Sequence, residues 1–435
     1  MTVGAARRTT ESDLQERSHL LRRLTFGPFP GGTEASLEDH PTTEGYLDAM
    51  VGAKPVPFDP PSNLDVPYRF GDVKIFKDEK LTNTELIHYW IKRMARDDIG
   101  LHDRMMWFWH TLFTTSGKMG TDLFLFRQLR TLHTHAMGNL RALAKALVID
   151  PAMMQFLSSD FSKISDPNEN LGRELMELFL MGRGNYTEDD VRAAAQGLAG
   201  WRVDFYTDVA SLADPTPMPP VTLLGKTGRF DPDAVVDQIL TKPIVATHVV
   251  GKLWKSFIGG PKDEAQIKEW ADQFRASDYE IAPLMAAIVR SDAFRSAKLT
   301  RPRSGVEWLV PIIRVLESAK FDPDQNYLDP SKLDELGQVP YFPPNVAGWP
   351  DDSQWLSSST GYSRASYVLN TKSKLPAVPK AERVEHALRR CGIYTLSAST
   401  AAALERFNDD VRGTPSERTT AVVKAAILTP EFGLA

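Results

Sequence analysis

Cysteine is almost absent from this sequence, which contains only Cys391. A single thiol cannot form an intrachain disulfide or a thiolate-rich metal site, so both are excluded. Long apolar runs are missing too, because no segment approaches the ~18 consecutive apolar residues of a membrane span. The first residues are small and polar and lack the apolar core of a secretory signal. We therefore expect a cytoplasmic protein without a membrane span.

An excess of positive charge is missing as well. Lys+Arg 51 against Asp+Glu 56 gives a net charge of -5, so we expect no nucleic-acid partner. Glycine-rich nucleotide motifs, the H-E-x-x-H zinc motif and the G-x-S-x-G nucleophile motif are all absent. We predict no cofactor but keep a divalent metal ion open. The expected partner is a small-molecule substrate or another protein, and the oligomeric state does not follow from the sequence.

Helical periodicity, in contrast, runs along most of the 435 residues. Apolar residues recur at intervals of three and four, whereas strand-like fragments are confined to residues 203–230. We predict a mainly α protein, a compact multi-helix bundle with long proline-rich loops and at most a small β-hairpin around 203–230. The longest proline-rich loop is expected at 53–80. Residues 1–12 are expected to be disordered, and residues 13–435 to form a single all-α domain.

One stretch, residues 168–182, combines a strongly amphipathic helical pattern with ionisable side chains. Glu174 and Glu177 are three residues apart, so they project from neighbouring positions on one side of a helix. Arg173 reaches Glu169 and Glu177 at a spacing of four and can pair with either. Such a ladder commonly marks a solvated face or a structural ion pair. Near apolar walls, two carboxyl groups can instead differ in pKa, so that one serves as acid and the other as base.

Other candidates are polar residues within apolar patterns. His110 is the only titratable side chain in the run 105–110, which is apolar nearly all round and predicts a buried helix. Residues 122–148 form the longest helical pattern, and His135 and Asn139 belong to a polar row along it. A satisfied core histidine and a row that faces water are the structural alternatives to a functional site.

Prolines exclude a helix from the segment 341–350, and its aromatic residues are expected to pack against another element. The candidate catalytic residues are Glu174, Glu177, His110 and Arg173. The candidate substrate-binding residues are Asn170, His135, Asn139 and Trp349.

Several short motifs in a fixed order carry a family resemblance. The most specific lie in residues 168–178, followed by Asn185-Tyr186-Thr187-Glu188 and Gly200-Trp201. Others are Leu20 to Gly27, Phe108-Trp109-His110, residues 130–139, Asp150-Pro151-Ala152-Met153, Lys252-Leu253-Trp254, Ser291-Asp292-Ala293-Phe294, residues 343–350 and Thr429-Pro430-Glu431-Phe432. Together they resemble a bacterial family known as domain of unknown function 1800, over almost the whole chain.

The resemblance implies a fold family and no settled reaction. Members commonly carry an export signal and many are encoded beside sulfatase-like proteins, whereas we expect no export signal in this sequence. It also has Leu112 and Phe179 where relatives often have histidines. The Glu-x-x-His spacing of dinuclear iron sites is missing, because Leu180 stands three residues after Glu177. If those histidines bind a metal in relatives, this chain has lost the site or uses another.

Two functions remain. The first is an enzyme that uses a carboxylate, arginine and histidine pocket for hydrolysis or group transfer on a small or secondary-metabolite-like substrate. The second is a non-catalytic partner, a maturation or assembly scaffold for a sulfatase-like protein, with the 341–350 loop as its docking surface. The enzyme hypothesis predicts that Glu174, Glu177 and His110 line one closed pocket. The scaffold predicts satisfied ion pairs without a cavity.

Overall fold

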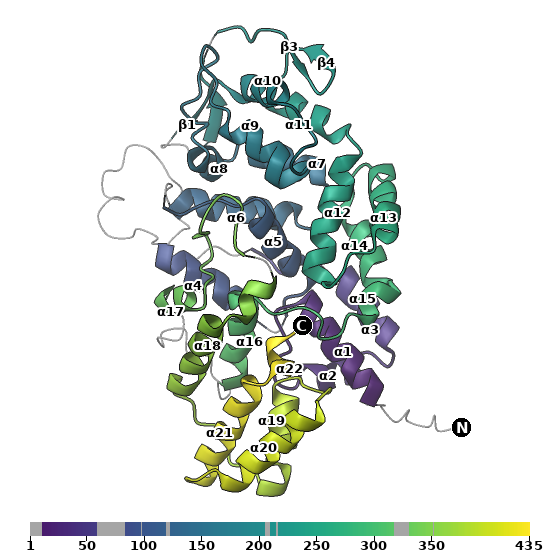
Figure 1. Ribbon diagram of the computed structural model, residues 1–435, viewed down its shortest axis with the longest axis vertical. Coiled ribbons are helices and arrows are strands. Elements are labelled where there is room, and N and C mark those ends of the chain that lie inside the picture. The colour runs from purple at the N-terminus through teal and green to yellow at the C-terminus, as the bar shows by residue number, and fades with distance from the viewer. Residues whose placement is uncertain are drawn as a thin grey trace.

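The computed structural model describes residues 11–58, 83–96, 98–118, 122–204, 209–214, 216–316, 330–350 and 352–435. These residues form helices α1 to α22 and two small β-hairpins, which confirms the predicted mainly α fold. The molecule is elongated (Figure 1). We divide its helices into an upper, a middle and a lower group, and the N-terminal helices of the middle group lie at the height of the lower group in this view. No helix within the described ranges is both long and apolar enough to cross a membrane.

The middle group contains the N-terminal helices and the helices around α5. Two of the N-terminal helices, α1 and α3, lie beside α14 and α15, far from them in sequence (Figure 1). The group comprises α1 (Glu11–Leu24), α2 (Gly32–Asp39), α3 (Thr43–Gly52), α4 (Asn83–Met94), α5 (Leu101–Leu112), α6 (Asp122–His135), α12 (Ile244–Phe257), α13 (Glu264–Ala276), α14 (Ile281–Arg290) and α15 (Asp292–Ser296).

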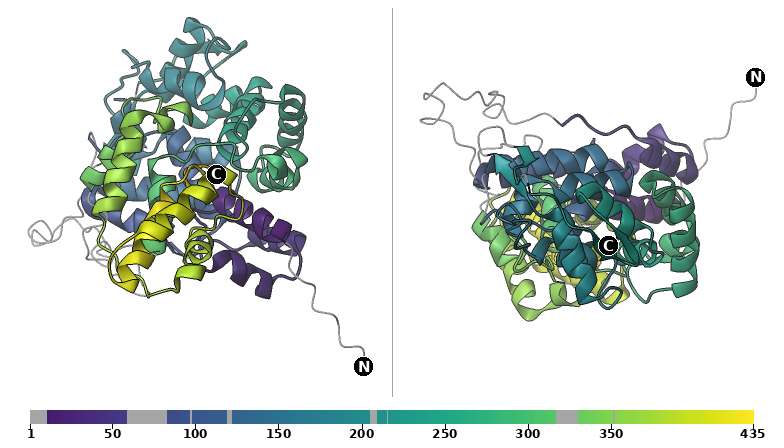
Figure 2. Two further views of the ribbon diagram at one scale, coloured as in Figure 1. Left: turned by 60° about the horizontal axis from the view of Figure 1, so that its bottom comes forward. Right: turned by 90° about the horizontal axis from the view of Figure 1, so that it is seen from above.

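The upper group carries the stretch singled out in the sequence, and the lower group closes the chain (Figures 1 and 2). The upper helices are α7 (Leu140–Val148), α8 (Pro151–Phe156), α9 (Asn170–Glu174), the π-helical turn η2 (Leu175–Leu180), α10 (Glu188–Leu198) and α11 (Pro232–Leu240). The lower helices are α16 (Gly305–Leu316), α17 (Pro330–Glu335), the short η4 (Asp352–Leu356), α18 (Ser358–Asn370), the short η5 (Lys380–Glu382), α19 (Arg383–Arg390), α20 (Ala398–Asp410), α21 (Pro415–Ile427) and α22 (Pro430–Gly433).

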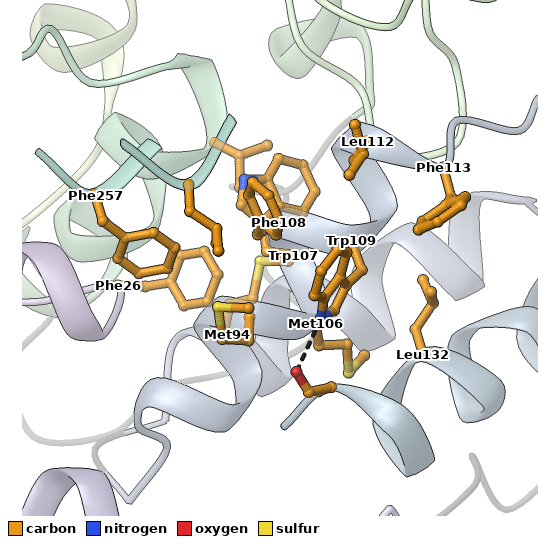
Figure 3. Close-up of a cluster of buried hydrophobic side chains, with 14 of the residues drawn as sticks. Phe26, Met94, Met106, Trp107, Phe108, Trp109, Leu112, Phe113, Leu132 and Phe257 are labelled. Carbon is orange, nitrogen blue, oxygen red and sulfur yellow. Dashed lines mark hydrogen bonds between the residues drawn. The ribbon is translucent and has the colours of Figure 1, made fainter. Parts of the chain in front are cut away.

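Helix α5 lies at the centre of the middle group and is buried along almost its whole length, as its apolar sequence predicts (Figure 3). Its aromatic side chains pack against residues from distant segments, including Phe26 and Phe257. The indole of Trp109 donates a hydrogen bond to the carbonyl of Ala136, 2.9 Å away. One continuous hydrophobic cluster extends from Leu20 to Phe432.

The strands form two antiparallel hairpins, whereas the sequence predicted at most one small hairpin around 203–230. The first pairs β1 (Trp201–Asp204) with β2 (Val209–Leu212), and the second pairs β3 (Val221–Leu223) with β4 (Lys226–Gly228). The strand-like residues Phe205 and Tyr206 lie outside the described residues.

Several expected boundaries differ in the structure. Helix α1 begins at Glu11, inside the segment predicted to be disordered, and residues 1–10 lie outside the described residues. Most of the proline-rich loop 53–80 also lies outside them, while residues 53–58 are irregular.

The long pattern at 122–148 is two helices rather than one, because Asn139 caps α7. Its side-chain oxygen accepts hydrogen bonds from the backbone N–H groups of Arg141 and Ala142. Asparagine at such a position competes with helix continuation and favours a helix start. The predicted polar row therefore does not continue along one helix to Asn139.

Asp150 caps α8 from a fully buried position. Its Oδ1 accepts hydrogen bonds from the Met153 backbone N–H at 3.1 Å and from Gln128 Nε2 at 2.9 Å. The Gln128 carbonyl in turn accepts a hydrogen bond from the Thr115 hydroxyl, 2.5 Å away. Burial disfavours the carboxylate form and raises the pKa of Asp150 to about 7.

Because of Asp150, the free energy of unfolding is expected to fall as pH rises toward and through neutrality. Its carboxyl keeps a proton in the folded state up to about pH 7, whereas the unfolded chain loses it at the ordinary, lower pKa. The free energy of unfolding should drop by about 2 kcal/mol between roughly pH 5 and pH 8. Asp150→Asn keeps the capping oxygen and should flatten this dependence in urea titrations. Asp231→Asn, at the exposed cap of α11, is the matched control and should leave the dependence intact.

Candidate functional site

The central stretch forms a helix that widens from α9 into the π-helical turn η2. Its end is marked by the N–H groups of Met181 and Gly182, which both donate to the carbonyl of Met176, at 2.8 and 3.0 Å. Gly182 has a φ of 81°, a left-handed conformation that commonly ends a helix. Single π-helical turns are frequent at functional sites.

A histidine from another helix stabilises the widened turn. His248 of α12 donates from Nε2 to the carbonyl of Leu178, 3.1 Å away. Burial lowers the pKa of His248 to about 4, so the ring is neutral at pH 7. A Cβ atom at Gly182 would lie only 2.8 Å from its Nδ1. The turn and the imidazole therefore depend on a residue without a side chain at position 182.

Glu177 projects from this turn into a network of hydrogen-bond donors. Its Oε1 accepts from Arg183 Nε at 2.8 Å, and its Oε2 accepts from the Tyr186 hydroxyl at 2.5 Å. The Tyr186 hydrogen bond and the Arg183 ion pair hold the pKa of Glu177 below its ordinary value. Its side chain is 16% exposed. Glu177 is thus an ionised carboxylate that two neighbours hold in place.

Glu174, one turn earlier, has the opposite environment. Its side chain is half-buried, and no hydrogen bond or ion pair reaches its carboxyl group from the part of the chain that the structure describes. Burial, reinforced by the charge of Glu177, raises the pKa of Glu174 above its ordinary value. The two carboxyl groups therefore differ in pKa in the way that an acid–base pair requires.

Arg173 and Asn170 lie on the first turns of the same helix. Arg173 donates to Glu169 at 2.9 Å and to Glu188 at 2.8 Å, so it forms ion pairs with these residues and not with Glu177. Asn170 is exposed and lies four residues before Glu174, hence on the same side of the helix. The structure brings Asn170, Arg173, Glu174 and Glu177 together on one surface.

Tyr186 is held at the entrance to α10 by a capping box. The Thr187 hydroxyl accepts a hydrogen bond from the Asp190 N–H, and the Asp190 carboxylate accepts one from the Thr187 N–H. The spacing of Thr187 and Asp190 is typical of such a box, but nothing in the sequence indicates that the preceding tyrosine reaches Glu177. Tyr186, Arg183 and His248 are the contributors to this site that the sequence analysis missed.

His110 lies in a different place, fully buried in an aromatic cluster. The rings of Trp90, Tyr341 and Trp349 surround it, with centroid distances of 4.7, 5.0 and 5.3 Å. Its Nε2 accepts a hydrogen bond from the Tyr341 backbone N–H at 3.3 Å. Burial lowers the pKa of His110 to about 3. No described contact joins His110 or Trp349 to the two glutamates.

His135 and Asn139 occupy a third place, at the junction of α6 and α7. Asn139 uses its side-chain N–H groups to bind the carbonyl of Asp278 at 2.7 Å and Glu280 Oε1 at 2.8 Å. His135 is half-buried, and burial lowers its pKa. The eight predicted site residues therefore separate into three groups, and only the group around Glu174 and Glu177 combines several of them with titratable chemistry.

Among the described residues, no three histidine, cysteine, aspartate or glutamate side chains are close enough together to hold a metal ion. Two cavities in the same part of the chain are lined by other residues than Glu174, Glu177 and His110. The expectation that these three line one closed pocket is therefore not met by either cavity.

Comparison with known proteins gives one match. A family model described as "Protein of unknown function (DUF1800)" matches residues 19–434. No curated protein and no solved structure matches the chain.

Proposed function

Because the chain belongs to the DUF1800 family, whose function is unknown, we propose its activity from its own residues: it is an enzyme that catalyses hydrolysis or group transfer on a small molecule by acid–base catalysis. Glu177 is the proposed base and Glu174 the proposed acid. The observation that carries the proposal is the opposite environment of these two carboxyl groups one helical turn apart.

The environments assign the two roles. Glu177 is ionised through the Tyr186 hydrogen bond and the Arg183 ion pair, so it can accept a proton from water or from a substrate hydroxyl. Each carboxylate oxygen has two lone pairs, which leaves room for that proton beside the existing bonds. Glu174 lacks such donors and is half-buried, so it retains a proton to higher pH and can donate it to a leaving group.

The neighbours of the pair fit a small polar substrate. Asn170 presents an exposed amide on the same side of the helix as Glu174. Arg173 is held by Glu169 and Glu188, so its positive charge is fixed beside the pair and can orient an anionic group. His110, Trp349, His135 and Asn139 have no place in this step. Their predicted roles in catalysis and substrate binding stay predictions.

The test is turnover of a panel of aryl esters, amides, phosphates and glycosides by the purified protein. We expect at least one class to be hydrolysed, and the double variant Glu174→Gln/Glu177→Gln to lose that activity while keeping its thermal unfolding temperature. Glu405→Gln, on the exposed face of α20, is the matched charge control and should retain it. Equal turnover by the double variant would reject the proposed acid–base pair.

A second candidate function is a non-catalytic partner of a sulfatase-like protein. It is favoured by the ion pair of Glu177 with Arg183 and by the position of both described cavities away from the two glutamates, as a scaffold predicts. It is also favoured by two large apolar side chains that face solvent in the upper group, Phe161 at 73% and Leu212 at 56% exposure. Their segments are adjacent, because the carbonyl of Ser162 accepts hydrogen bonds from Gly200 N–H and from Arg202, each at 3.0 Å. Exposed apolar side chains on neighbouring segments are typical of a docking surface.

Co-purification separates the two functions. A scaffold predicts that a sulfatase-like protein encoded beside this one binds it, and that Phe161→Ser with Leu212→Ser abolishes binding. The same double variant should leave turnover unchanged if the protein is an acid–base enzyme. Binding that is lost in this variant, without turnover of any substrate class by the wild-type protein, would replace the enzyme with the scaffold.

A further inference from the structure

A cavity of about 450 Å³ lies between the middle and lower groups, apart from the carboxylate pair. Residues from four segments line it: α4, the loop after α5, α17 and the turn 337–344. They are Thr84, Ile87, Lys118, Ser331, Asp334, Gly337, Val339, Phe342, Pro343 and Pro344. This volume is within the range of roughly 300–1,000 Å³ that is typical of small-molecule sites.

One part of the cavity lining is apolar. Ile87 of α4, which is 1% exposed overall, lines the cavity together with Phe342 and Pro343 of the turn. The Phe342 ring offers a planar apolar face, against which a flat aromatic ring can stack.

The turn that carries this part of the lining is fixed before any ligand binds. Tyr341 has a φ of 64°, an uncommon conformation for a residue with a side chain. Its N–H donates to His110 Nε2 at 3.3 Å, and its carbonyl accepts from the Gly117 N–H at 2.7 Å. The N–H of Phe342 donates to the carbonyl of Val339, 3.0 Å away. These bonds give the buried His110 a positioning role, because it holds the turn that places Phe342.

The rim of the cavity carries one charge of each sign. Lys118 and Asp334 are both exposed, and neither side chain forms an ion pair within the described residues. The first turn of α4 also reaches the cavity through Thr84, and the N-terminal end of a 12-residue helix adds a partial positive charge. The side of the rim with Lys118 therefore favours an anionic group, while Asp334 can accept a hydrogen bond from an N–H or O–H group.

We propose that this cavity binds a flat, apolar ring compound that carries an anionic group and a hydrogen-bond donor. Phe342 and Ile87 contact the ring, Lys118 contacts the anion and Asp334 accepts the donor. The site is independent of the acid–base proposal, because none of its residues belongs to the Glu174 group.

Three compounds with one ring system test the proposal: fluorinated indole-3-acetate, the corresponding neutral alcohol and the corresponding tryptamine. Broadening of the ¹⁹F resonance upon addition of the full-length protein reports binding at millimolar affinity or tighter. We expect the anion to bind at least about 10-fold more tightly than the cation, with the alcohol between them.

Charge variants make the result specific to this cavity. Lys118→Glu should weaken binding of the anion about 10-fold and strengthen binding of the cation, because the rim charge is reversed. Asp334→Asn keeps an acceptor oxygen and removes a repulsive charge, so it should bind the anion at least as tightly as the wild type. Lys226→Glu, in the exposed β3–β4 hairpin, makes the same charge change elsewhere and should have no effect.

Phe342→Ala tests the apolar part of the lining and should weaken binding of all three compounds by about 10-fold. If this variant unfolds, Lys118→Glu still decides, because its side chain is exposed. Unchanged binding in Lys118→Glu would overturn the proposal, as would a cation that binds the wild type as tightly as the anion does.

Discussion

Replacement of Glu307 by alanine is expected to lower the free energy of unfolding by about 3–5 kcal/mol, the cost of leaving buried charges without a partner. Glu307 lies near the start of α16 and is 9% exposed. It accepts hydrogen bonds from the guanidinium groups of Arg104 and Arg301, the latter at 2.8 and 3.0 Å, and from the Ser304 N–H at 3.1 Å. Replacement by alanine removes the carboxylate that both buried guanidinium groups bind.

The arginines around Glu307 lie among apolar rings and further positive charge. Arg104 is 1% exposed and lies over the rings of Phe26 and Phe257, each 5.6 Å from its guanidinium carbon (Figure 3 shows both rings beside α5). Arg303 is a further buried arginine close by, and burial lowers its pKa. The charge of Arg104 and Arg301 holds the pKa of Glu307 below its ordinary value despite burial. Its stabilisation is therefore present at neutral pH and is lost as pH falls through the carboxyl titration range.

Denaturant titration of three variants tests this network. Glu307→Gln keeps the shape and some hydrogen bonds but not the charge, so it should fall between the wild type and Glu307→Ala. Glu385→Ala removes an exposed ion pair with Arg389 on α19 and should cost only about 0.3–0.5 kcal/mol. If Glu307→Ala costs no more than Glu385→Ala, the arginines do not depend on this carboxylate.

The helices could be predicted because their signals are local. The apolar run of α5 and the Thr187–Asp190 capping box depend on residues within one or two turns of each other, and the structure has both. The π-helical turn η2 was not predictable, because an α-helix and a π-helical turn share the same apolar spacing. Within this turn, the carbonyl of Leu178 accepts a hydrogen bond from His248, which is 70 residues away in the sequence. The predicted cytoplasmic location and single-domain organisation stay predictions.

The candidate site likewise has one part that follows from local sequence signals and another part that depends on distant residues. The spacing of Glu174 and Glu177 places them on one side of the helix, and this follows from helical geometry alone. Their partners Arg183 and Tyr186 come from the turn after the helix, whose path no periodicity describes. His110 shows the limit more strongly, because its hydrogen-bond partner Tyr341 is 231 residues away. An isolated histidine in an apolar run therefore indicates burial, but its partner cannot be predicted from the run.

The buried arginines gave no signal in the sequence. An arginine such as Arg104 in an amphipathic helix is expected to face water, because few charged side chains are fully buried. Here Arg104 and Arg301 from distant segments share one carboxylate of α16. Such an arrangement depends on how three segments meet, and helical periodicity does not describe it.

Once a substrate is found, replacement of Glu174 by glutamine is expected to lower kcat by about 10²–10⁴-fold, the usual contribution of a positioned acid or base. In the wild type the rate should be bell-shaped with pH, since activity needs Glu177 ionised and Glu174 protonated. The acidic limb then follows the lowered pKa of Glu177, and the alkaline limb follows the raised pKa of Glu174. Because the two carboxyl groups interact, the pKa values read from the two limbs describe the pair and not either residue alone.

Each substitution changes this profile in its own direction. Glu174→Gln should remove the alkaline limb. Glu177→Gln should remove the acidic limb. It should also move the alkaline limb to lower pH, because the charge of Glu177 that raises the pKa of Glu174 is gone. Tyr186→Phe removes one hydrogen bond to Glu177 and should move the acidic limb to higher pH with a smaller loss of kcat. A purely structural role for Tyr186 would lower activity without moving either limb. A shift of the acidic limb would therefore show that Tyr186 acts through the ionisation of Glu177.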